Sequence, residues 1–99
     1  LRWKDMKDSE VKNSLEKSHH IFSSLKKYDI KSLEETLLKE AKKFNLENGY
    51  PEKDRGYLLW PLRVALSGKQ ASASPFEIAE ILGPEKTLQR IQSAKELLS

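Results

Sequence analysis

The sequence contains no cysteine, which excludes disulfide bridges, thiolate metal ligands and a cysteine nucleophile. Such a chain suits a reducing compartment, and we expect it in the cytoplasm. Glycine and proline number only 4 each among 99 residues. No apolar run approaches the roughly 18 residues that a membrane-spanning helix needs, so we expect no membrane segment. The chain begins with Leu1 rather than Met, from which we expect it to be part of a longer protein.

Catalytic motifs are also missing. The glycines stand apart at positions 49, 56, 68 and 83, so no glycine-rich loop can cradle a phosphate, and no Gly-x-Ser-x-Gly elbow is present. His19 and His20 are adjacent, about 100° apart around a helix, and only Glu16 has the spacing of a helical metal ligand beside them. We interpret both as ordinary helix histidines. The sequence therefore predicts no catalytic residue, no metal site and no enzyme activity for this chain alone.

The composition that remains is that of one folded domain. Hydrophobic residues make up 37% of the chain and charged residues 33%, which is too apolar for a disordered tail. A chain of 99 residues supports a single core, so we expect one domain over residues 1–99. The balance of 18 Lys+Arg against 15 Asp+Glu gives a net charge of +3, which allows a nucleic-acid partner without requiring one.

Helical periodicity and capping signals recur along the whole chain, and no alternating strand pattern appears. The spacing predicts a first helix from about Asp8, capped by Asp8 or Ser9, to about Tyr28. A capping box of Ser32 and Glu35 predicts the start of a second helix, which ends near residue 48, before Gly49. Further helices are predicted over 57–67, 75–83 and 84–98. The fold class is therefore all-α, a compact bundle of about five helices.

The third of these segments, residues 57–66, is the densest apolar run and is predicted to be the central, most buried helix. Pro61 should kink it or begin its second half. Arg63 is unusual inside this run, because a guanidinium there must either form an internal ion pair or emerge toward a ligand. Aromatic residues could stack on unpaired bases, but most have core phase. We expect Tyr50, in a polar connection, to be the exposed exception.

A loop of small and polar residues follows this helix and precedes the start at Pro75, where Ser74 caps and Glu77 lies in the first turn. The loop and its flanks gather cationic and hydrogen-bonding groups, and we predict a recognition surface there. Its candidate residues are Arg63, Lys69, Gln70, Ser72, Ala73 and Pro75.

The same region carries a resemblance that covers essentially the whole chain. The residues that carry it are Pro61 to Gly68, Lys69, Ser72, Pro75 to Glu77, Leu82, Gly83, Leu88, Arg90 and Ile91. They resemble the C-terminal anticodon-binding domain of bacterial-type glutamyl-tRNA synthetases, and Leu1 to Asp5 look like the junction segment of that family. One departure is the loop from Ser72 to Phe76, which lacks the proline and glycine placement of many members.

The resemblance implies a non-catalytic helical module that reads the anticodon of glutamate tRNA. The parent enzyme would be a glutamate–tRNA ligase, with ATP and Mg bound by a catalytic domain whose signature motifs are missing here. Residues 1–7 would join this module to preceding domains. By position, Arg63 matches the arginine that approaches the anticodon bases, and Ser72, Ala73 and Pro75 lie in the contacting loop.

The competing hypothesis is a helical protein-interaction module that binds no nucleic acid. Its docking surface would be the apolar stripe of the first helix, from Val11 to Leu25. We expect a monomer in either case.

Overall fold

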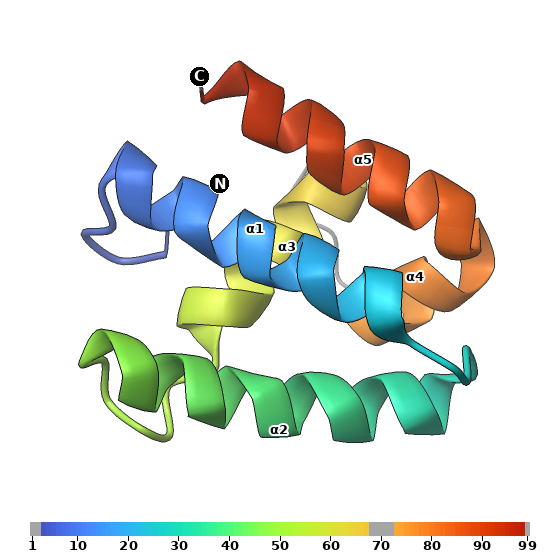
Figure 1. Cartoon of the computed structure of the whole chain (residues 1–99), viewed down its shortest axis with the longest axis horizontal. Coiled ribbons are helices and arrows are strands. Elements are labelled where there is room, and N and C mark those ends of the chain that lie inside the picture. Colours follow the sequence, from blue (N-terminus) through green and yellow to red (C-terminus); the bar gives the residue numbers. More distant parts are fainter. Residues whose placement is uncertain (1–2, 68–72, 99) are drawn as a thin grey trace.

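The computed structural model describes residues 3–67 and 73–98. Its helices are α1 (Asp8–Ser24), α2 (Ile30–Asn48), α3 (Gly56–Ser67), α4 (Pro75–Leu82) and α5 (Pro84–Leu97), shown in Figure 1. The described residues contain no strand, which confirms the all-α class and the five helices. None of these helices is both long and apolar enough to cross a bilayer.

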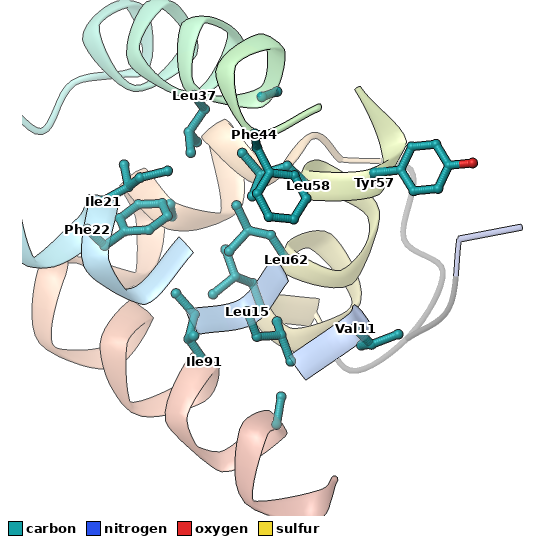
Figure 2. Packing of buried hydrophobic residues seen from close by; sticks show 14 of the residues in the cluster. Val11, Leu15, Ile21, Phe22, Leu37, Phe44, Tyr57, Leu58, Leu62 and Ile91 are labelled. Atoms are coloured by element: carbon teal, nitrogen blue, oxygen red, sulfur yellow. The ribbon is translucent and has the colours of Figure 1, made fainter. Parts of the chain in front are cut away.

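Helix α3 lies at the centre of the molecule and packs against each of the other four helices. Leu58, Leu62 and Leu66 recur every four residues on it and are fully buried. Figure 2 shows Leu62 directed toward Leu15 of α1 and Ile91 of α5. In Figure 1, α2 and α5 lie on opposite sides of this centre. The prediction that the third helix is the central, buried one is confirmed.

Pro61 lies inside α3 and does not begin a separate helix. Proline has no N–H, so the carbonyl of Tyr57, four residues earlier, loses its usual helical donor. The hydroxyl of Ser14 on α1 donates to that carbonyl at 2.7 Å, in a fully buried position. A side chain of the neighbouring helix therefore compensates for the proline and joins α1 to α3.

The predicted end of the first helix is wrong by four residues, because α1 stops at Ser24 rather than near Tyr28. Ser23 and Ser24 donate to the carbonyls of His19 and His20, one turn back, which weakens a helix end. Leu25 is already extended, with φ −68° and ψ 135°. Tyr28 instead reaches α5, where its hydroxyl donates to Thr87 Oγ1 at 2.8 Å.

The predicted caps of the first two helices are also wrong. Lys7 holds the N-cap position of α1, and Glu10 accepts its backbone N–H at 3.0 Å. Asp29 caps α2 by accepting the N–H of Ser32 at 2.8 Å. The aspartate precedes Ser32 and offers a charged acceptor, so the N-cap lies three residues before the expected one. Gly49 ends α2 at φ 73°, as predicted.

The connection from α2 to α3 is organised by Asn45, which is fully buried. The two N–H groups of its Nδ2 are shared among three carbonyls of the connection, those of Pro51 at 3.0 Å, Glu52 at 3.2 Å and Asp54 at 2.8 Å. A buried side chain on α2 thus fixes the path by which the chain enters α3.

Tyr50, at the start of this connection, is packed and not an exposed exception, so that expectation is wrong. Its ring stacks on Tyr57 with centroids 4.0 Å apart and planes 3° apart. Its hydroxyl donates to Glu10 at 2.7 Å. Burial and this carboxylate raise the pKa of Tyr50 to about 12.

The start of α4 follows the sequence prediction. Ser74 holds the N-cap position and accepts the N–H of Glu77, while Pro75 occupies the first turn. Gly83, at φ 84°, ends α4, and Pro84 opens α5 at once. From α5, Arg90 donates to the carbonyl of Leu66 at 2.6 Å. The last turn of α3 and the first turn of α4 are therefore each held by a specific side chain.

Candidate nucleic-acid interface

A cleft of about 370 Å³ opens between the N-terminal segment, α3 and the start of α4. Its volume lies within the range of small-ligand sites. Its walls combine indole rings, guanidinium groups and a helix N-terminus. The lining residues are Trp3, Arg55, Gly56, Leu59, Trp60, Arg63, Ser74, Pro75 and Glu77.

Arg63 and Pro75, two of the residues singled out in the sequence, come together in this cleft. They are brought there by α3 and by the capped start of α4. Ala73 directly precedes the lining residue Ser74. Lys69, Gln70 and Ser72 lie outside the described residues. The structure therefore describes the parts of the predicted surface that lie on α3 and at the start of α4.

Arg63 is half-buried, and its guanidinium carbon lies 5.6 Å from the centroid of the Trp60 ring. A cation at this distance from an indole is attracted to the ring and loses freedom of orientation. The arrangement directs a planar, five-donor group to a wall of the cleft.

Trp3 and Trp60 are the only tryptophans of the chain, and both line the cleft. Their centroids are 5.6 Å apart and their planes are inclined by 46°. The sequence analysis assigns most aromatic residues, these two included, to core packing, so it missed this pair. For Trp60, the useful signal was its position three residues before Arg63, on the same helical face.

Trp3 is held in place by Asp54. Its Nε1 donates to Asp54 Oδ1 at 2.8 Å, and the same oxygen accepts the N–H of Gly56 at 3.1 Å. Lys4 forms an ion pair with the other carboxylate oxygen. Burial alone would raise the pKa of Asp54, but hydrogen bonds from Lys4, Gly56 and Trp3 outweigh it and lower that pKa below its ordinary value. One carboxylate thus joins the N-terminal segment to the start of α3.

We expect the position of Trp3 to depend on pH through this carboxylate. Because the pKa of Asp54 is lowered in the folded protein, its bonds to Trp3 and Lys4 are present at neutral pH and are lost as the pH falls through that lowered pKa. In a Trp60→Phe protein, whose emission comes from Trp3 alone, the emission should shift to the red in acid before the helices unfold. Asp54→Asn should remove this separate acid transition. If the emission and the helical circular dichroism of the Trp60→Phe protein change in one common acid transition, the prediction is contradicted.

The charge of the cleft is mixed but has more positive than negative groups. Arg55 and Arg63 line it, against the single carboxylate of Glu77. Among the described residues, no group of three His, Asp or Glu side chains could hold a metal ion. The arrangement of flat rings beside guanidinium donors can hold a planar, polar, unstacked group such as a nucleobase.

Comparison with known proteins agrees with this geometry. Residues 2–95 match a family model described as "Anticodon binding domain". The chain belongs to this family. The match covers both the helices that form the cleft and the core that supports them.

Three relatives of this anticodon-binding domain are each named "Glutamate--tRNA ligase". One from Clostridium tetani is 35% identical over 86 residues, which is 86% of this chain and 16% of the relative. One from Clostridium botulinum is 36% identical over 80 residues, or 80% of this chain and 15% of the relative. One from Lachnoclostridium phytofermentans is 38% identical over 79 residues, 79% and 15% respectively. The chain thus spans about 15% of the length of these relatives. No solved structure matches it.

Proposed function

We propose that this anticodon-binding domain reads the anticodon of glutamate tRNA, and that the cleft between α3 and α4 receives unpaired anticodon bases. The observation that carries the proposal is the meeting of Arg63 and Pro75 in one cleft with two tryptophans, in a chain whose relatives are named glutamate–tRNA ligases. The contact set is Arg63, Lys69, Gln70, Ser72, Ala73 and Pro75.

The proposal extends to the protein of which this domain is a part. We place residues 1–99 as a single C-terminal domain of a glutamate–tRNA ligase, with residues 1–7 leading from preceding domains. Those domains bind ATP and Mg and join glutamate to the tRNA, while this domain contributes tRNA binding and no catalytic group. The ligase acts as a monomer in the cytoplasm.

The physical basis is the chemistry of an anticodon. Its bases are unpaired and expose their pairing edges, so a protein can stack on their faces and bond to their edges. The Arg63 guanidinium presents donors in a fixed fork, and its contact with Trp60 restricts its direction. The start of α4 adds the positive end of a helix at Pro75, in part satisfied by Ser74 and Glu77.

The alternative, a protein-interaction module that docks through the first helix, loses its surface in this fold. Val11, Leu15 and Phe22 of the apolar stripe are buried in the core, where α1 packs on α3 and α5. Leu25 is half-buried. The stripe is therefore already occupied by the other helices of the same chain.

Replacing Arg63 with Ala should weaken binding of an RNA stem-loop with a glutamate anticodon about tenfold, because a charge-assisted, forked contact to a base is lost. Arg63→Lys should recover only part of the affinity, since a lysine cannot form the fork. Lys39→Ala, on an exposed position of α2, removes the same charge away from the cleft and serves as the control. Titration calorimetry at two salt concentrations measures the three affinities.

Comparison of Arg63→Ala with Lys39→Ala distinguishes binding at the cleft from binding through net charge. An equal loss for Arg63→Ala and Lys39→Ala would mean that the RNA binds through net charge alone, and would contradict the proposal. In the ligase that contains this domain, Arg63→Ala should raise the KM for tRNA and leave the KM values for ATP and glutamate unchanged. NMR shifts caused by the stem-loop should cluster around Arg63 and residues 73–75, not on residues 11–25.

A further inference from the structure

We propose that Trp3 is a base-contacting residue of the cleft, and that Asp54 and Gly56 are the positioning residues that hold its ring there. The inference rests on the proposed function, because it takes a nucleobase as the ligand. It extends the binding surface from the helices to the segment that precedes them, which the sequence had suggested only as a junction.

The first argument is the anchoring of the indole ring far from its own place in the sequence. Trp3 lies 51 residues before Asp54, yet its Nε1 donates to that carboxylate at 2.8 Å. This bond fixes the polar edge of the ring and leaves the ring half-buried at the cleft, 5.6 Å from Trp60 by centroids. Trp3 packs against the edge of the core, whereas Phe44 lies within it at 2% exposure. Trp3 instead presents part of its surface to the cleft.

The second argument is the glycine beneath the ring. A Cβ at Gly56 would overlap the Cε2, Cδ2 and Nε1 atoms of Trp3, well inside van der Waals contact. Gly56 is the first residue of α3 and does not have a left-handed φ. The backbone conformation therefore does not require glycine here, whereas the close approach of Trp3 does. The start of α3 is shaped to receive this ring.

The third argument is the chemistry of the combined surface. Two indole rings inclined by 46° and an arginine beside one of them form one cleft. Aromatic rings stack on any base, while the guanidinium reads a base edge. Trp3 thus contributes affinity with little base preference, and the preference comes from Arg63.

The binding test uses the whole 99-residue chain and the anticodon stem-loop as probe. Trp3→Ala should weaken binding about tenfold, the order of magnitude expected for one lost base stack. Trp3→Phe, which keeps an aromatic face, should recover most of the affinity. In the Trp60→Phe protein, the stem-loop should quench the emission of Trp3 with the same midpoint as binding. Ile81→Ala, at an exposed apolar side chain of α4, is the control for a change outside the cleft.

The positioning test uses Gly56→Ala, because the added Cβ displaces Trp3 while alanine has a higher helix propensity than glycine. This variant should weaken binding as much as Trp3→Ala. In a Trp60→Phe background it should also shift Trp3 emission to the red and increase its quenching by acrylamide. The double variant Trp3→Ala, Gly56→Ala should bind as Trp3→Ala alone, since Gly56 acts only through the ring. Additive losses in the double variant would overturn the positioning role.

The outcomes also separate this inference from the proposed function. If Arg63→Ala weakens binding while Trp3→Ala and Gly56→Ala bind as the unaltered chain does, the role of Trp3 is overturned and the proposed function stands. If the stem-loop binds equally to the Arg63→Ala, Trp3→Ala and unaltered chains, both are overturned.

Discussion

Replacing Asn45 with Ala should lower the free energy of unfolding by about 3 kcal/mol, because three backbone carbonyls share the two N–H donors of its amide and lose both. The amide is fully buried, so water cannot easily replace it. Asn45 also holds the path that leads to Asp54, and the change should loosen Trp3. Urea denaturation followed by helical circular dichroism measures the stability, and tryptophan emission at low urea reports on Trp3.

An isosteric control distinguishes hydrogen bonding from packing. Asn45→Asp keeps the size of the side chain but places a carboxylate oxygen against the carbonyls of Pro51, Glu52 and Asp54. It should destabilise the protein more than Ala at neutral pH, and part of the loss should be recovered in acid as the new carboxylate is protonated. Equal stability of the Asp variant and the unaltered protein would show that the amide donor contributes nothing.

The sequence could have pointed to Asn45 but did not by itself reveal its partners. It stands four residues after Ala41 and next to Phe44, so it shares the phase of the buried face of α2. A polar residue at that phase indicates a buried hydrogen bond. Its acceptors, however, are carbonyls of an irregular connection, whose positions depend on tertiary packing and not on any residue type.

The helices and their order could be predicted because the hydrophobic periodicity and the positions of the helix-breaking Gly and Pro residues agree along most of the chain. The dense apolar run around Leu62 predicted the central helix, and Ser74 with Pro75 predicted the start of α4. The predicted start of α2 was wrong because two nearby residues could each cap the helix. Asp29 and Ser32 are both good caps, and only the packing of α2 and the contact of Glu80 with the N–H of Ile30 favour the earlier start.

The sequence predicted one part of the candidate site, Arg63 and Pro75, but not Trp3. Arg63 stands out because a guanidinium is unusual in an apolar run, and Pro75 because of its capping pattern. Trp3 could not be assigned, since nothing local relates it to Asp54 or Gly56. Residues distant in sequence meet through the fold, and a periodic pattern says only which face of a helix is buried, not what covers it.

The second large prediction concerns the hydrogen bond that Ser14 donates to the Tyr57 carbonyl. Pro61 removes the donor that this carbonyl would have in a regular helix, and Ser14 supplies one from α1 at 2.7 Å. Ser14→Ala should therefore lower the free energy of unfolding by about 2 kcal/mol, the cost of a buried carbonyl without a partner. Urea denaturation measures this loss.

A double-variant cycle tests whether the proline is the cause. With Pro61→Ala, residue 61 regains an N–H that can bond to the Tyr57 carbonyl, so the further change Ser14→Ala should cost much less than it does beside the proline. The difference between the two costs should be about 1 kcal/mol or more. Equal costs in both backgrounds would mean that Ser14 stabilises the α1–α3 contact by packing alone.

Ser18 provides the matched control, one turn further along the same helix. It is as fully buried as Ser14, but no described residue bonds to its Oγ. Ser18→Ala should therefore leave stability unchanged or raise it, because a buried hydroxyl without a partner is itself unfavourable. Ser14 faces a carbonyl that Pro61 leaves without its helical donor, and no such acceptor bonds to Ser18.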